Sequence, residues 1–272
     1  MSNSCALTVF GILIGLGASA QAGPIDDCIS GQVARRILVC TEAIQDDHLD
    51  DRQMAEAYDS RGTGYFAQGK LPEAISDFDQ AARLKPDQAS FRIHKGDASL
   101  AAGQLDQAIA EYNQAIQLAP GSSDGFIGRG TVRLHQQKLE EALADFDEAV
   151  RLNPNSLLAY NNRGDAHFSL GQFDLAIADF NHVIDRDPNA FQAYYNRGNA
   201  YSAKGTLSAA VDDLTKAISL RPDLPNAYYN RAINLGRMGS QNAAIADLRK
   251  ALEIDPSYQP ERKALLMLGV SP

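Results

Sequence analysis

Apolar residues recur at helical spacing along most of the chain, and residues 157–190 show the pattern most plainly. One stripe, whose spacings of three and four place its members on a single helical face, contains Leu157, Tyr160, Gly164, His167 and Phe168. A second stripe with the same property contains Phe173, Ala176, Ile177, Phe180, Val183 and Ile184. Between the stripes lies Gly171, a residue type that readily adopts the positive φ with which many helices end. The segment is therefore predicted to form two helices joined by a tight turn.

This helix-turn-helix pattern repeats every 34 residues without a slip, from 86 to 120 for example. The prolines that close successive units are Pro86, Pro120, Pro154, Pro188, Pro222 and Pro256. One aromatic position holds Tyr58, Phe126, Tyr160, Tyr194 and Tyr228, interrupted only by Arg92. A small position holds Gly62, Gly96, Gly130, Gly164 and Gly198, and another holds Ala74, Ala108, Ala142, Ala176, Ala210 and Ala244. A fixed period of this length indicates a repeat protein whose core is built unit by unit.

At these positions the chain resembles the tetratricopeptide repeat (TPR) family, whose helix-turn-helix units have this length. The resemblance covers six tandem units, 55–88, 89–122, 123–156, 157–190, 191–224 and 225–258. It implies an all-α, right-handed α-solenoid with capping helical segments at 23–54 and 259–272. It also implies an exported bacterial TPR-repeat protein, a non-catalytic scaffold or adaptor that binds a peptide segment or a helix of a protein partner in its concave groove. A homo-oligomerisation or assembly module is the alternative.

Two charged positions also recur, sixteen residues apart in each unit. The basic position holds Arg61, Lys95, Arg129, Arg163, Arg197 and Arg231, and the acidic one holds Asp77, Glu111, Asp145, Asp179, Asp213 and Asp247. This offset connects the first and second helices of a unit, so we expect ion pairs between them, the alternative being a basic stripe for an anionic partner. Glycines such as Gly164 are expected to let the helices approach closely, opposite the equally small alanine position.

Composition and motifs narrow the classes of function. The chain has 272 residues, of which 44% are hydrophobic, and a formal net charge of −9, so nucleic acid is not expected as a partner. The five histidines show no HExxH pattern and no close spacing to cysteine, and the sequence contains no GxSxG, phosphate-loop or haem-attachment motif. We therefore expect no enzyme activity, no cofactor and no metal site.

Residues 1–22 contain an apolar run, residues 6–20, that ends in small residues. This pattern is typical of a secretory signal peptide cleaved after Ala20 or Ala22, although no lysine or arginine precedes the run. The run is shorter than the roughly 20 residues that span a bilayer, so no stable membrane span is expected. We therefore expect an exported, periplasmic protein. A cytoplasmic adaptor is the alternative if the segment is not a signal peptide.

Removal of residues 1–22 would leave two cysteines, Cys28 and Cys40. An even number of cysteines in an exported chain favours a disulfide bond, and two buried thiols are the alternative. A bond between them would join two turns across a bend near Gly31, since a continuous helix would hold the sulfurs apart. Residues 32–45 resemble the second helix of a unit, but they precede the matching residues of the first unit by 38 positions instead of 34. This offset predicts a degenerate N-terminal cap. It also predicts that the loop after the cap, within residues 46–53, is longer than in the repeats.

The candidate binding residues lie on the first helices, which line the concave surface in this family. One recurring position there holds Ser60, His94, Gly128, Asn162, Asn196 and Asn230. The three successive asparagines resemble the ladders with which some family members hold the backbone of an extended chain, and bonding to a neighbouring helix is the alternative. The preceding position includes Tyr195 and Tyr229, which we expect to anchor side chains of the partner. The predicted peptide site therefore lies in the fourth to sixth units.

Overall fold

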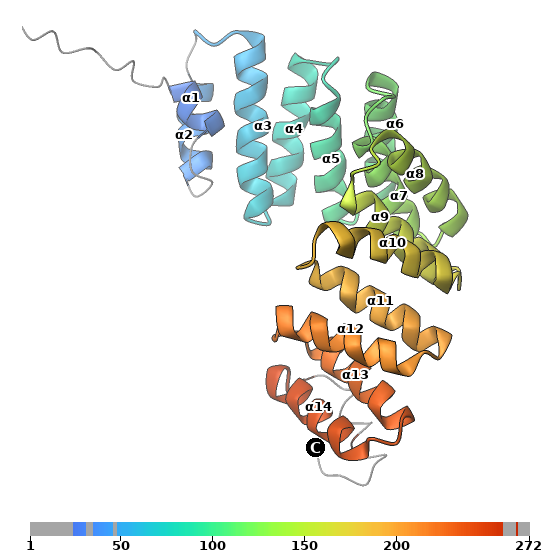
Figure 1. Ribbon diagram of the computed structural model, residues 1–272. Helices are drawn as coiled ribbons and strands as arrows, with labels where there is room; N and C mark the ends of the chain where they lie inside the picture. The colour runs from blue at the N-terminus through green and yellow to red at the C-terminus, as the bar shows by residue number, and fades with distance from the viewer. Residues whose placement is uncertain (1–23, 31–34, 46–47, 258–264, 266–272) are drawn as a thin grey trace, which may run out of the picture.

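A computed structural model describes residues 24–30, 35–45, 48–257 and 265 (Figure 1). Within these residues the chain forms fourteen helices and no strand. The helices are α1 (Pro24–Ser30), α2 (Arg36–Ile44), α3 (Asp51–Ala67), α4 (Leu71–Leu84), α5 (Ala89–Ala101), α6 (Leu105–Leu118), α7 (Asp124–His135), α8 (Leu139–Leu152), α9 (Leu157–Ser169), α10 (Phe173–Arg186), α11 (Phe191–Lys204), α12 (Leu207–Leu220), α13 (Pro225–Arg237) and α14 (Gln241–Ile254). The expected signal peptide and, apart from Leu265, the expected C-terminal capping helix lie outside the described residues.

Each predicted unit contains one pair of helices. We refer to the first helices (α3, α5, α7, α9, α11 and α13) as A helices and to the second helices (α4, α6, α8, α10, α12 and α14) as B helices. Consecutive A helices pack against each other along the array, whereas consecutive B helices do not pack as closely. The array therefore curves into an arc with the A helices on its inner side (Figure 1). The prediction of an all-α solenoid is confirmed.

The turn inside each unit contains one residue in the left-handed conformation. Glycines with φ between 71° and 86° occupy this position in five units, as Gly69, Gly103, Gly171, Gly205 and Gly239. In the third unit the position is held by Gln137, with φ 59°. The hydrogen bonds of the turn are kept there, because Gln137 N donates to Leu134 O at 3.0 Å and Lys138 N donates to Arg133 O at 2.9 Å. The geometry of the repeat thus imposes on Gln137 a backbone conformation that its Cβ atom disfavours.

The glycines of the A helices let large side chains of the paired B helices approach closely, and at Gly198 the alanine position is near as well, with Ala210 O 3.3 Å from where a Cβ atom would lie. A Cβ atom at Gly164 would lie 2.6 Å from the Phe180 ring, which is fully buried. The ring occupies the space that the missing Cβ leaves, and this contact explains why glycine recurs in spite of its cost in a helix. In the sixth unit Ala232 replaces the glycine, and it packs with Leu248, a smaller side chain than the ring.

The N-terminal cap is a short pair of helices held by a disulfide bond. Cys28 of α1 and Cys40 of α2 are bonded, with 4.7 Å between their Cα atoms, and both side chains are fully buried. They form one cluster with Ala43 of α2 and Ala57 of α3. The bonded pair therefore covers the first A helix, where no preceding unit is available to do so.

The first A helix begins earlier than its unit. α3 starts at Asp51, inside the segment 46–53 that was predicted to contain a loop. Asp50 and Gln53 form a capping box, in which the Asp50 carboxylate accepts from Gln53 N at 2.8 Å and the Gln53 side chain accepts from Asp50 N at 3.1 Å. This reciprocal pair satisfies two free amide groups of the helix, so the helix extends toward the cap.

Candidate functional site

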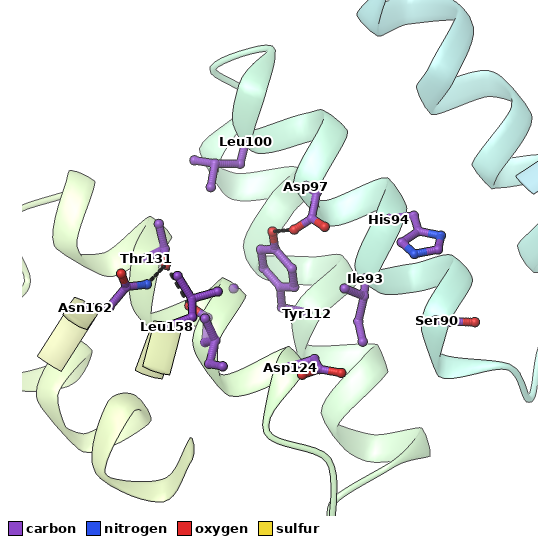
Figure 2. A pocket seen from close by; sticks show the side chains of 12 residues that line it. Ser90, Ile93, His94, Asp97, Leu100, Tyr112, Asp124, Thr131, Leu158 and Asn162 are labelled. Atoms are coloured by element: carbon purple, nitrogen blue, oxygen red, sulfur yellow. Dashed lines mark hydrogen bonds between the residues drawn. The ribbon is translucent and has the colours of Figure 1, made fainter. Parts of the chain in front are cut away.

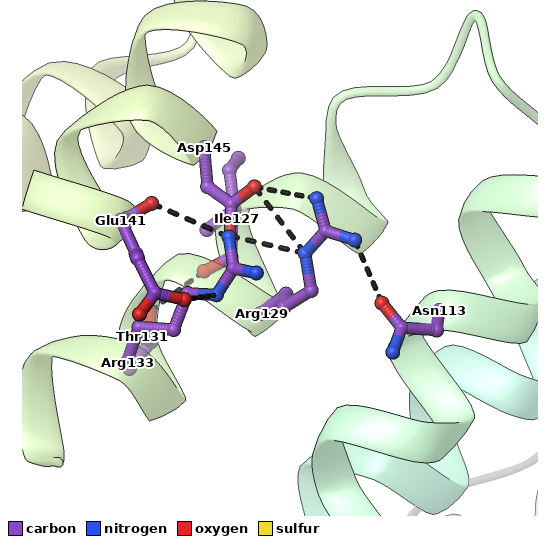
Figure 3. A network of polar contacts seen from close by, with 7 residues as sticks. All are labelled: Asn113, Ile127, Arg129, Thr131, Arg133, Glu141 and Asp145. Carbon is purple, nitrogen blue, oxygen red and sulfur yellow. Dashed lines mark hydrogen bonds and ion pairs between the residues drawn. The ribbon is translucent and has the colours of Figure 1, made fainter. Parts of the chain in front are cut away.

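Charged residues form a structural network between the two helices of each unit, shown for the third unit in Figure 3. Every basic residue of the recurring position pairs with the acidic residue sixteen positions later, at nitrogen–oxygen distances of 2.6–2.7 Å. The acidic side chains are only 4–10% exposed. The predicted ion pairs are therefore confirmed in all six units, and these six basic residues do not form a free stripe for an anionic partner.

The same basic residues connect successive units. Arg129 Nη1 donates to Asn113 Oδ1 at 2.7 Å (Figure 3), and Arg163 Nη1 lies 2.9 Å from Asp147 Oδ1. Both acceptors belong to the B helix of the preceding unit. The Arg163 guanidinium also lies 5.2 Å from the centroid of the Tyr160 ring, within cation–π range. Each basic residue thus ties three helices together, and we assign this network to stability.

A second polar network runs along the groove and contains the predicted asparagines. Each asparagine donates through Nδ2 to the A helix of the preceding unit. The bonds are Asn162 to Thr131 Oγ1 at 3.2 Å, Asn196 to Asp165 Oδ1 at 2.6 Å and Asn230 to Asn199 Oδ1 at 2.8 Å. The asparagines therefore form a continuous row across α7, α9, α11 and α13. We call these contacts the polar bridges.

The polar bridges leave part of each amide for a ligand. Within the described residues, the Oδ1 atoms of Asn162 and Asn230 accept no hydrogen bond, whereas Asn196 Oδ1 accepts from Gln192 at 3.0 Å. An amide held by its nitrogen presents its oxygen in a fixed position. The row can thus accept hydrogen bonds from backbone amides of an extended chain, while its nitrogens hold the repeats together. The bonds to neighbouring helices are thus observed for all three asparagines, and capture of a peptide backbone stays a prediction.

The two predicted tyrosines occupy different places. Tyr229 lines a hollow of about 600 Å³ between α9, α11 and α13, the second hollow, together with Phe168, Asn199, Ser202, Asn230 and Ile233. Tyr195 is partly buried against the cluster of Ile218, Ala227 and Tyr228, and its hydroxyl accepts from Asn230 Nδ2 at 3.1 Å. Tyr229 is therefore placed to contact a ligand, whereas Tyr195 supports Asn230.

The groove contains another hollow, which lies where the polar bridges are interrupted (Figure 2). This first hollow, of about 570 Å³, lies between α5, α7 and α9 and is lined by residues that include Ile93, Asp97, Tyr112, Ile127, Leu158 and Asn162. At the asparagine position of α7 stands Gly128, where a Cβ atom would lie 2.2 Å from the Tyr112 ring. Tyr112 comes from B helix α6, and its hydroxyl donates to Asp97 Oδ1 at 2.6 Å. Gly128 thus leaves room for the Tyr112 ring, and among the described residues no side chain at this position bridges to α5.

Two carboxylates of the groove have raised pKa values. The surrounding protein raises the pKa of Asp97 above its usual value, although the hydrogen bond from Tyr112 acts in the opposite direction. Burial raises the pKa of Asp165 to about 7. His94 pairs with Asp59, with 2.6 Å between Nδ1 and Oδ1; burial lowers the pKa of His94, but this hydrogen bond and the Asp59 charge outweigh it and raise the pKa overall. Asp97 and Asp165 are therefore protonated more readily than a free aspartate.

The described part of the chain has neither a metal-ligating cluster nor a helix suited to a membrane span. No group of three or more histidine, cysteine or acidic side chains there could hold a metal ion. No helix in that part is long and apolar enough to span a membrane. His167, a member of the first apolar stripe, has 14% of its side chain exposed, and its Nδ1 lies 2.7 Å from Gln172 Oε1. The groove thus remains the candidate site.

Sequence analysis missed the first hollow and placed the site only in the C-terminal half. The signal was present in three positions of the repeat. Gly128 interrupts the asparagine position, and Tyr112 stands where the other B helices have Phe or Leu. Leu158 is the only apolar residue at a position otherwise held by Glu56, Ser90, Asp124, Gln192 and Asn226. These departures fall in different units, so only contacts between units show that they meet.

Comparison with known protein families matches nearly the whole array. Residues 60–123 and 225–258 match families described as tetratricopeptide repeat, and residues 130–171, 164–205 and 198–239 match one described as TPR repeat. Comparison with curated protein sequences finds no significant match.

Solved structures of similar fold include three at 18–21% identity. The APC/C hetero-tetramer Cut9-Hcn1 has a TM-score of 0.76, and the alignment covers 90% of this chain but only 47% of that one. PilW, a type IV pilus biogenesis factor, has a TM-score of 0.73 and coverages of 78% and 99%. YrrB, a TPR protein with an unusual peptide-binding site, has a TM-score of 0.56 and coverages of 69% and 96%. With its matched families, paired helices and 34-residue period, the chain belongs to the tetratricopeptide repeat family.

Proposed function

We propose that this protein is a non-catalytic interaction scaffold of the periplasm that binds a segment of a protein partner in the groove formed by its A helices. The proposal is supported by membership of the TPR family and by neighbours such as YrrB, whose description includes a peptide-binding site. The observation that carries it is the row of polar bridges. Asn162 lies at the first hollow, Asn230 lies at the second, and Asn196 stands between them.

The row fits an extended partner segment better than a helix. Backbone amides of an extended chain are free to donate, and the amide oxygens of Asn162 and Asn230 are free to accept. A helix has already used most of its own amides. Side chains of the segment would enter the two hollows, with Tyr229 as an aromatic wall of the second. Backbone bonds would supply affinity with little dependence on sequence, and the hollows would supply preference.

Export is proposed from two features outside the array. Residues 6–20 have the length and composition of a signal-peptide core, and small residues follow them. The buried bond between Cys28 and Cys40 is of a kind that persists in oxidising compartments. Together they favour a periplasmic partner.

The test is a peptide selected from a random display library on the immobilised protein. Changing Asn162, Asn196 and Asn230 to alanine together should weaken its binding by about tenfold or more, because each lost backbone hydrogen bond contributes about 0.5–1.5 kcal/mol. Unchanged affinity would refute backbone capture by the row. These changes also remove three contacts between units, so some loss of stability is expected as well.

A matched control separates these effects. Asn113 and Asn181 also connect successive units, as acceptors from Arg129 and Arg197, but they lie on B helices. Their change to alanine should lower the melting temperature while leaving peptide affinity within about twofold. If both sets of variants weaken binding equally, the effect of the groove asparagines is on stability alone.

A further inference from the structure

The first hollow has a chemistry of its own that follows from Gly128. At the equivalent place in neighbouring units, a side chain connects two A helices, as His94 does to Asp59 and Asn162 does to Thr131. Between α5 and α7 this connection is absent because Gly128 has no side chain. The space is open to the groove, and its floor is the Tyr112 hydroxyl bonded to Asp97 (Figure 2).

The walls of the first hollow are apolar. Ile93 and Ile127 lie on the adjacent A helices α5 and α7, and Leu158 lies on the next one, α9. Leu158 is 59% exposed. The equivalent positions of the neighbouring units hold the polar residues Asp124 and Gln192. An aliphatic chain in the hollow would cover part of this leucine and contact both isoleucines, which favours an occupant with a hydrocarbon stem.

The floor of the hollow favours a cation. The Tyr112 bond uses Asp97 Oδ1, and within the described residues Oδ2 accepts no hydrogen bond. A second carboxylate, Asp124, also lines the hollow, and its charge adds to the rise in the pKa of Asp97. Among the described residues, no lysine or arginine lines the hollow. His94 is paired with Asp59, and its charge lowers the pKa of Asp97 without a hydrogen bond between the two. A further cation that reaches Asp97 and Asp124 would stabilise their charged forms.

We propose that the first hollow receives a lysine or arginine side chain of the partner segment, with its stem against Ile93, Ile127 and Leu158 and its charged group at Asp97 Oδ2. The inference rests on the proposed function, since the basic side chain belongs to the segment held by the asparagine row. Asn162 lies both in that row and at the border of the hollow, so a segment held there has its side chains within reach. The scaffold thereby acquires a preference for basic segments, in agreement with the net charge of −9.

The test uses single amino-acid probes and methyl NMR spectra of the whole protein labelled at isoleucine and leucine. The probes are the N-acetyl N-methylamides of lysine, arginine, norleucine and glutamate. The lysine and arginine probes should shift the methyl signals of Ile93, Ile127 and Leu158 and bind about fivefold more tightly than norleucine, which has a similar stem without the charge. Equal or tighter binding of norleucine or glutamate would overturn the assignment, as would shifts confined to other methyl groups.

Two variants locate the charge. Asp97→Asn retains an oxygen that accepts from Tyr112, so the fold should be kept, and it should reduce affinity for the lysine probe about fivefold while leaving norleucine unchanged. Asp106→Asn is the control, because Asp106 is an exposed carboxylate of the B helix α6 and does not line the hollow. It should leave lysine affinity within about twofold. Unchanged lysine affinity in Asp97→Asn would overturn the proposal.

The outcomes for the two proposals can be told apart. The selected peptides could require the asparagine row, lack a basic residue and bind the Asp97→Asn variant with unchanged affinity. That result would overturn the basic-residue assignment and leave the proposed function standing. If instead the lysine probe binds the hollow as described while the asparagine variants bind peptides normally, backbone capture fails and the assignment of the hollow stands.

Discussion

Replacing Gln137 with glycine is expected to stabilise the protein. Gln137 has a φ of 59°, whereas the five equivalent residues are glycines with φ between 71° and 86°. An L-residue in this region costs about 1–2 kcal/mol. Its side chain is exposed and makes no hydrogen bond within the described residues, so the change removes no contact of that kind.

Part of this gain is offset in the unfolded chain. Glycine has more unfolded conformations than glutamine, which costs about 0.4–1 kcal/mol. The net stabilisation is therefore about 0.5–1 kcal/mol, which corresponds to a rise of roughly 1–4 °C in melting temperature for an array of this size. The assay is thermal and urea unfolding followed by circular dichroism at matched protein concentrations.

Gly171→Gln is the matched control in the next unit. A Cβ atom there has no neighbour within 4 Å, so the change introduces backbone strain without a steric clash. It should destabilise the protein by about the amount that Gln137→Gly stabilises it. If Gln137→Gly lowers the melting temperature while Gly171→Gln is neutral, the left-handed conformation is not what these turns require, and the reasoning is refuted.

Two further predictions concern the groove and the cap. The pKa of Asp165 is raised to about 7 by burial, so the folded protein holds this proton more tightly than the unfolded chain and loses stability as pH rises from about 4 to 7. Asp165→Asn should therefore match the wild type near pH 4 and exceed it at pH 8 by up to about 4 kcal/mol in unfolding experiments, and equal curves at both pH values would contradict this. The intact mass of the native protein should correspond to a chain that begins at Gln21 or Gly23. Cys28 and Cys40 should resist alkylation until the protein is reduced. A full-length chain with free thiols would contradict export.

The fold follows from the sequence because each determinant lies within one unit. The 34-residue period, the turn glycines and the closing prolines act between residues close in the chain. The ion pairs were also predictable, since an offset of sixteen connects helices of the same hairpin. The side chain that packs against Gly164 was not predictable, because the period of the repeat does not show whether Ala176 or Phe180 faces it.

Features that depend on neighbouring units were not predictable in the same way. The asparagine row was found from its period, but its bonds to Thr131, Asp165 and Asn199 depend on the angle between units. The first hollow needs Gly128 from one unit and Tyr112 from the unit before it. Such pairs have no local signature, and they become evident only when the curvature of the array is known.

The central claim, that partners bind in the groove of the A helices, is tested most directly by site-specific photo-crosslinking in the cells that produce the protein. A photoreactive residue is placed at Leu158 or Gln192, which occupy the same A-helix position in adjacent units. In the control proteins it is placed at Leu175 or Lys216, which are exposed on B helices α10 and α12. The account predicts a crosslinked protein partner from both A-helix positions and none from the B-helix positions. The same partner crosslinked only from the B helices, or equally from both sides, would contradict it.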